Sequence, residues 1–105
     1  MRGEYCQLWL TCTDQKEADK IAKALLEKRL IACAKQVAIT SDFIWEGKIE
    51  RNNEILLIME SREDLFDEIE AEVAKLHSYD SFVLTATPIT KVSKKAQKWL
   101  DKELN

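Results

Sequence analysis

The chain has 105 residues, of which 33% are charged, and its formal net charge is -3 at pH 7. This length suits one compact domain over residues 1–105, with one hydrophobic core that oligomerisation can reinforce. The acidic balance argues against a nucleic-acid partner. No apolar run approaches the roughly 20 residues of a membrane span, and the N-terminus lacks a signal-peptide pattern. We therefore expect a cytoplasmic protein with no membrane partner.

The first two predicted elements are a strand over residues 5–13 and a helix over residues 14–29. In the strand, cysteine and leucine alternate with larger or polar residues, which is typical of a strand with one buried face. Asp14 and Glu17 have the spacing of a capping box, and apolar residues follow at helical spacing. These apolar residues are Ala18, Ile21, Ala22, Leu25 and Leu26.

A long hairpin is predicted next. Residues 31–45 and 48–60 both alternate as strands, and Glu46-Gly47 supplies the turn between them. Ser61 and Asp64 then indicate a helix start, and the helix runs to about His77. A short strand over residues 82–87 and a terminal helix over residues 93–104 complete the chain. The order β-α-β-β-α-β plus a helix predicts an α+β, ferredoxin-like split βαβ fold with sheet order 4-1-3-2.

The long hairpin must project beyond its own sheet, because its strands are about twice as long as their neighbours at roughly 3.3 Å per residue. Its unpaired edges and tip aromatics favour contact with another copy of the chain. The alternative is that Trp45 folds back on its own domain or is exposed. The residues predicted to form an oligomer interface are Trp9, Phe43, Trp45, Glu46, Lys48 and Trp99.

Four stretches resemble the divalent-cation tolerance proteins of the CutA family. They are LLEKRLIAC (25–33), WEGKIE (45–50) followed by Glu54, LHSY (76–79) and KWL (98–100). The resemblance implies a ferredoxin-like homotrimer with hairpins exchanged between subunits, a role in tolerance of copper and other divalent cations, and no settled enzymatic activity. The chain departs from the family pattern in a shorter loop without proline after the first strand, in HSYD at 77–80, and in Ala96. These departures surround one expected inter-subunit cleft.

The predicted metal ligands are Cys12, Cys33 and His77. Cys6 and Cys12 share a strand face but lie about 20 Å apart by the rise per residue, so one chain offers no pair of thiolates for an ion. A thiolate suits monovalent copper, and a thiolate with imidazole suits zinc. A site for copper or another divalent cation, built from Cys12 or Cys33 with His77 across a subunit boundary, is therefore one hypothesis. The alternative is that the cysteines are small buried hydrophobes.

A second predicted site is the polar cluster of His77, Tyr79 and Asp80, which can bind a metal or an unknown small molecule. The alternative for His77 is a helix C-terminal cap. No nucleophile-base spacing or phosphate-binding glycine loop is present, so we expect no enzyme. Three functions remain open: a metal-linked trimer, a small-molecule-binding trimer similar in general architecture to nitrogen-regulatory signalling proteins, and a structural scaffold.

Overall fold

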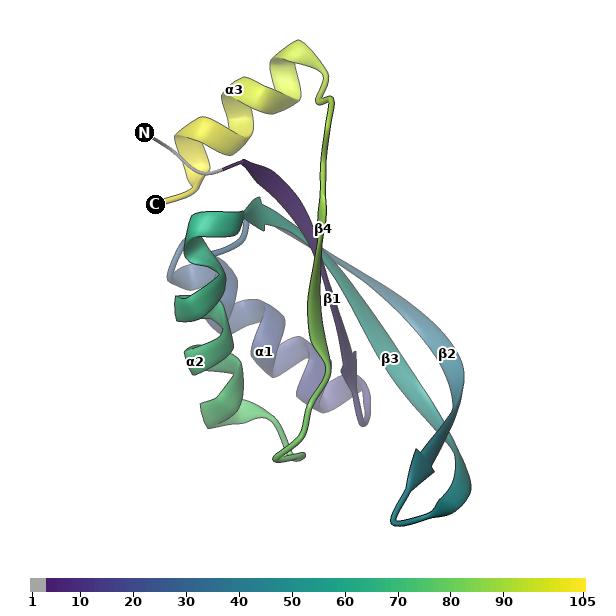
Figure 1. Ribbon diagram of the computed structural model, residues 1–105. Coiled ribbons are helices and arrows are strands. Elements are labelled where there is room, and N and C mark those ends of the chain that lie inside the picture. The colour runs from purple at the N-terminus through teal and green to yellow at the C-terminus, as the bar shows by residue number, and fades with distance from the viewer. Residues whose placement is uncertain (1–3) are drawn as a thin grey trace.

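The computed structural model describes residues 4–105 as one four-stranded sheet flanked by helices (Figure 1). The sheet order is β2-β3-β1-β4 with antiparallel pairing throughout, which confirms the predicted 4-1-3-2 arrangement and the α+β fold. In chain order the elements are β1 (Tyr5–Cys12), α1 (Gln15–Glu27), β2 (Cys33–Trp45), β3 (Lys48–Arg62), a 3-10 turn (Glu63–Leu65), α2 (Phe66–Leu76), β4 (Leu84–Pro88) and α3 (Lys94–Glu103).

Helices α1 and α2 cover one face of the sheet (Figure 1). The side chains of β1 alternate between the two faces, and those directed at the helices are completely buried. Burial of each such leucine contributes about 1.5–3 kcal/mol to the stability of the fold. Because all of its inward side chains are buried, β1 lies at the centre of the core. The buried residues of β1 are Cys6, Leu8, Leu10 and Cys12, and they pack with Ile21, Leu25, Leu57, Met59, Ile69 and Val73.

Two local predictions were wrong. Ser61 does not cap a helix, because β3 continues through Arg62, and the Ser61 hydroxyl donates to the Leu30 carbonyl at 2.6 Å. The second strand begins at Cys33 rather than at Ile31, although Ile31 is buried. In both cases buried contacts between segments distant in sequence override the local pattern.

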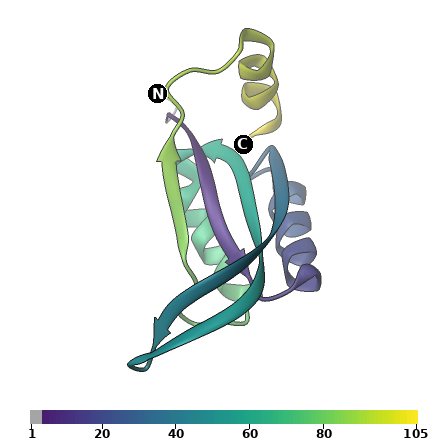
Figure 2. The ribbon, with the colours of Figure 1, turned by 90° about the vertical axis from the view of Figure 1, so that its right-hand side faces the viewer.

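The β2–β3 hairpin extends beyond the rest of the sheet. β1 ends at Cys12, opposite Ile55 of β3, and from there β2 and β3 pair only with each other, as far as Trp45 opposite Lys48. The turn has left-handed backbone at both central residues, with φ 51 at Glu46 and φ 79 at Gly47, as a two-residue hairpin requires. Figure 2 shows the hairpin twisting past the end of the sheet, on the side of the α2–β4 connection.

The two faces of the hairpin tip differ. Ile44 and Ile49 lie opposite each other on one face and are 76% and 83% exposed. Phe43 and Trp45 alternate with them and therefore lie on the other face. No helix in the described residues is long and apolar enough to cross a membrane.

Candidate functional site

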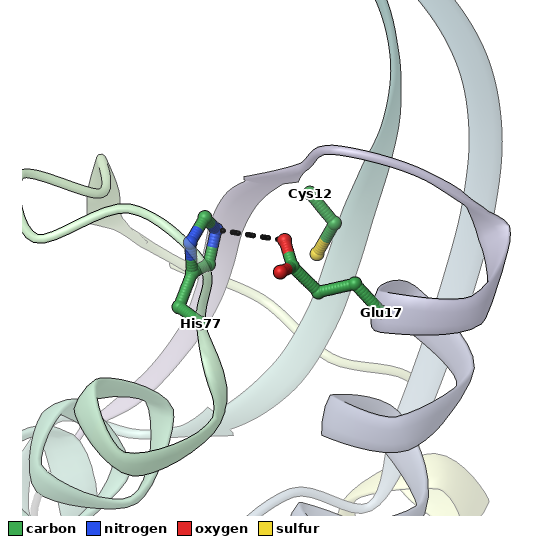
Figure 3. A group of neighbouring side chains, drawn as sticks. All are labelled: Cys12, Glu17 and His77. Atoms are coloured by element: carbon green, nitrogen blue, oxygen red, sulfur yellow. Dashed lines mark ion pairs between the residues drawn. The ribbon is translucent and has the colours of Figure 1, made fainter.

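Three potential metal ligands from different elements meet at one end of the sheet (Figure 3). Cys12 is the last residue of β1, Glu17 lies in the first turn of α1, and His77 directly follows α2. Their ligand atoms all lie within 4.8 Å of one another, and His77 Nε2 is 3.5 Å from Glu17 Oε1. Among residues 4–105 this is the group of three that has the spacing of a metal site.

The local sequence explains how Glu17 reaches this position. Asp14 caps α1, since its Oδ1 accepts the Glu17 backbone N–H at 2.8 Å, which confirms the predicted cap. The Glu17 side chain then turns back to the strand end, and Oε1 accepts the Thr13 backbone N–H at 3.0 Å. The capping turn therefore places a carboxylate beside the last residue of β1.

His77 is held by hydrogen bonds at both ring nitrogens. Nδ1 accepts the backbone N–H of Tyr79 at 3.0 Å, so Nε2 carries the proton and contacts the Thr11 carbonyl oxygen at 2.8 Å. The side chain is 0% exposed, and its ring packs 5.4 Å from those of Tyr79 and Phe82. In this arrangement His77 links the α2–β4 connection to the end of β1.

Glu17 is similarly engaged. Its Oε2 accepts the Ser78 backbone N–H at 2.8 Å, so the carboxylate joins the first turn of α1 to the α2–β4 connection. Burial by itself would raise the pKa of Glu17. The hydrogen bonds from Thr13 and Ser78 and the nearby His77 outweigh burial and hold this pKa below its ordinary value.

The Cys12 thiol is buried among these groups. Burial raises its pKa to about 12, and the negative charges of Glu17, Glu54 and Asp14 act in the same direction. Sulfur, imidazole nitrogen and carboxylate oxygen form a donor set that zinc and copper accept, so the residue types fit a cation. In the conformation seen here, however, Cys12 and His77 Nε2 hold protons that a cation must displace.

The structure does not bring all the predicted ligands together. In the sheet, Cys33 of β2 pairs with Glu60 of β3, and Glu60 in turn pairs with Gln7 of β1. Cys33 therefore lies near the start of β1, whereas Cys12 lies at its end. The Cys33 sulfur is instead 3.6 Å from Lys35 Nζ. Cys12 and His77 already meet within one chain, so pairing them needs no subunit boundary. Sequence reasoning missed Glu17 as a ligand, although the capping box was the signal that places it there.

Tyr79 and Asp80 belong to a different feature, a cleft of about 400 Å³ between the hairpin and the α2–β4 connection. His77 is not among the residues that line this cleft, and it instead accepts a hydrogen bond from the backbone N–H of Tyr79. Trp45 lines the cleft from the hairpin side and keeps 54% of its surface exposed. The predicted second site thus separates into Tyr79 and Asp80 at the cleft and His77 in the buried cluster.

The other predicted interface residues lie in three places. Trp9 is on the helix-free face and donates to Thr87 Oγ1 at 3.0 Å. Trp99 of α3 is 43% exposed and lines a separate cavity beside Gln7. Glu46 and Lys48 are exposed at the hairpin tip. Contact with a second copy through these residues stays a prediction.

Known proteins similar to this chain share the name CutA. The family model described as CutA1 divalent ion tolerance protein matches residues 6–103. The divalent-cation tolerance protein CutA of Archaeoglobus fulgidus is 40% identical over 94 residues, which cover 90% of this chain and 92% of that protein. The protein of the same name from Pyrococcus horikoshii is 36% identical over 96 residues, with coverage of 91% and 94%.

The solved structures agree. The structure of the periplasmic divalent cation tolerance protein CutA from Archaeoglobus fulgidus has a TM-score of 0.94 and 38% identity, and covers 96% of this chain and 99% of that one. The family match and the overall fold therefore extend over nearly the whole chain, including the hairpin. This chain belongs to the CutA1 family of divalent ion tolerance proteins.

Proposed function

We propose that this protein contributes to divalent-cation tolerance by binding a cation, copper or zinc, at Cys12, Glu17 and His77, as a homotrimer held together by its hairpins. The observation that carries the proposal is the meeting of sulfur, oxygen and nitrogen donors within 4.8 Å. This differs from the site expected from sequence, because Cys33 has no part in it and each chain supplies Cys12 and His77 together.

The chemistry of the cluster couples cation binding to proton release. Cys12, with a pKa of about 12, must lose its proton to become a thiolate ligand, and the positive charge of the cation favours that loss. His77 Nε2 must lose its proton and break its hydrogen bond to the Thr11 carbonyl oxygen. Binding therefore competes with the hydrogen bonds that hold the α2–β4 connection, so a bound cation changes how firmly that connection is held.

The support for a trimer lies in surfaces that one chain leaves uncovered. β2 forms an edge of the sheet, and its outer side is unpaired within the chain. Ile44 and Ile49 on the tip, at 76% and 83% exposed, have no local core to enter. Association of three copies would pair these edges and cover these side chains, and a closed ring leaves no free edge.

A metal titration under reducing conditions tests the cation site. We expect Zn²⁺ and Cu⁺, measured against a competing chelator, to bind the intact protein and to bind at least about tenfold more weakly to Cys12→Ser and His77→Gln, a loss of about 1.4 kcal/mol. Cys33→Ser is the matched control, because it removes a thiol outside the cluster. Equal affinity in Cys12→Ser and the parent protein would refute the site. Loss of binding in Cys33→Ser alone would move the site to Cys33.

Two further parts of the proposal concern catalysis and location. The protein acts by binding, with no chemical reaction assigned to it. We place it in the cytoplasm, where three unpaired thiols stay reduced, whereas the Archaeoglobus fulgidus relative is described as periplasmic. Fractionation of the producing cells tests the location, and recovery from the periplasm would contradict it.

A further inference from the structure

A further cavity, of about 430 Å³, lies toward the end of the sheet that is far from the hairpin tip (Figure 1). Its floor is the helix-free face of the sheet, where Gln7 of β1 pairs with Glu60 of β3. Its other wall is formed by α3 and by the connection that runs to it from the end of β4 (Figure 2). We call this cavity the α3 pocket. The cation cluster, at the other end of β1, does not contribute to it.

Within residues 4–105, one buried carboxylate oxygen at the α3 pocket has no hydrogen-bond partner. Glu60 Oε1 accepts from Lys35 Nζ at 2.5 Å, whereas Glu60 Oε2 is buried and unpaired. The side chain as a whole is 17% exposed, so solvent reaches little of it. A buried acceptor of this kind is destabilising unless it receives an N–H or O–H. Because Glu60 lines the pocket, a donor group on a bound molecule can supply that hydrogen bond.

The connection from β4 brings groups of the opposite kind to the pocket. Thr90 and Lys91 line it, and neither side chain has a hydrogen bond or ion pair with another described residue. A hydroxyl and an ammonium group both donate to a carboxylate. The pocket therefore has an acceptor on the sheet and donors on the connection.

Apolar side chains line the space between these polar groups. Val92, Ala96 and Leu100 contribute aliphatic surface, and Trp99 contributes an indole ring that is 43% exposed. An aromatic ring of this size buries a large apolar area when another apolar group packs on it. A pocket with an apolar lining and a few polar groups is the usual form of a small-molecule site.

From these observations we infer that the α3 pocket binds a small zwitterion of the α-amino-acid class that has an apolar side chain. Its ammonium group donates to Glu60 Oε2, its carboxylate accepts from Lys91 and Thr90, and its side chain lies against Trp99. Lys35 already neutralises much of the charge on Glu60, so a ligand with no net charge suits the pocket better than a metal ion.

This inference goes beyond the proposed cation binding and does not depend on it, because none of the three cluster residues lines the pocket. It also differs from the surfaces on which the proposed trimer rests. The outer edge of β2 and the hairpin tip do not line the pocket, and Trp99 is the one predicted interface residue that does. A trimer would therefore leave the Glu60 side of the pocket to the ligand.

The experiment titrates L-phenylalanine into the assembled, ¹⁵N-labelled protein and follows the indole N–H signals. We expect a saturable shift at Trp99, which lines the α3 pocket, and little change at Trp45, which lines a different cleft. Two analogues test the polar contacts, because 3-phenylpropionate lacks the ammonium group and 2-phenylethylamine lacks the carboxylate. Each should bind at least about tenfold more weakly than L-phenylalanine.

Variants test the two walls separately. Glu60→Gln keeps the shape of the side chain and removes its charge, so it should weaken L-phenylalanine binding at least about tenfold. Its matched control, Lys35→Gln, breaks the same ion pair from the other side and should retain binding. Lys91→Gln should weaken binding of L-phenylalanine and leave that of 2-phenylethylamine unchanged. Lys94→Gln, which alters an exposed lysine outside the pocket lining, should change neither.

Several results would overturn the inference. They are an absence of saturable shift at Trp99 in the assembled protein, equal affinity for either analogue, unchanged affinity in Glu60→Gln, and a crystal structure grown with L-phenylalanine in which only water contacts Glu60 Oε2. Retention of L-phenylalanine binding in Cys12→Ser would show that the pocket is independent of the cation cluster, whatever the metal titration gives. Loss of binding in a correctly assembled Cys12→Ser protein would contradict that independence and the placement of the ligand.

Discussion

His77 accepts a hydrogen bond from the backbone N–H of Tyr79 through Nδ1, at 3.0 Å. This bond determines the tautomer and leaves Nε2 to donate to the Thr11 carbonyl. A single buried ring thus fixes the connection that places Tyr79 and Asp80 in the cleft beside the hairpin.

Replacement of His77 by leucine should therefore destabilise the protein. His77→Leu introduces an apolar side chain of moderate size and leaves the Thr11 carbonyl and the Tyr79 N–H without their partner, at a cost of about 0.5–1.5 kcal/mol for each hydrogen bond lost. Denaturant unfolding of the assembled protein measures the change. Lys75→Ala, which alters a side chain that is 68% exposed, is the control. A His77→Leu protein as stable as this control would show that the ring contributes no net stability.

The Glu17 carboxylate should make the folded protein less stable at acid pH. Its folded pKa is depressed by the hydrogen bonds that outweigh burial, so its contribution is complete above the unfolded pKa of about 4.3. That contribution is lost as the pH falls through the folded pKa. Glu17→Gln should therefore lower Tm at neutral pH and reduce the fall of Tm on acidification, whereas Glu70→Gln should not. Identical pH profiles for Glu17→Gln and the parent protein would contradict this role.

The three thiols should differ in reactivity. Burial raises the pKa of Cys6 to about 11 and that of Cys12 to about 12, so almost no thiolate forms on either at mildly alkaline pH. Cys33 is partly exposed and lies 3.6 Å from an ammonium group. A disulfide reagent such as DTNB should react quickly with one thiol per folded chain, and Cys33→Ser should abolish that phase. A fast phase that survives in Cys33→Ser would show that Cys6 or Cys12 is accessible.

The exposed isoleucines at the hairpin tip should control assembly. The double variant Ile44→Ser and Ile49→Ser removes two side chains that are 76% and 83% exposed in the single chain, so it should weaken association without disturbing the core. Light scattering across a range of protein concentrations measures this as a shift from the proposed trimer to a monomer. Leu26→Ser on α1 is the control, because it makes a similar change in a residue outside the hairpin that is 41% exposed. A mass equal to that of the parent at every concentration would exclude the tip from the interface.

Much of the fold follows from local patterns in the sequence. The alternation in β1 and β3, the Asp14 cap and the Glu46-Gly47 turn are each determined by neighbouring residues, and the structure confirms all three. Ser61 was misassigned because its hydroxyl bonds to Leu30, a partner 31 residues away that no local pattern reveals. The element order then leaves few ways to arrange the sheet.

The site was less predictable. Cys12 and His77 were named from their chemistry, but their meeting depends on packing between β1 and the end of α2, which residue spacing does not give. Cys33 was grouped with them for its thiol chemistry and the family resemblance, and the register places it opposite Glu60 instead.

The alternation of side chains along the hairpin also limits how its length can change during evolution. Adding one residue to each strand keeps the pairing and the turn, but it reverses the two faces of the tip, so that the isoleucines and the aromatic residues exchange sides. Adding two residues to each strand restores the original sides and moves the tip outward by about 7 Å. Functional relatives with longer or shorter hairpins should therefore differ by even numbers of residues per strand.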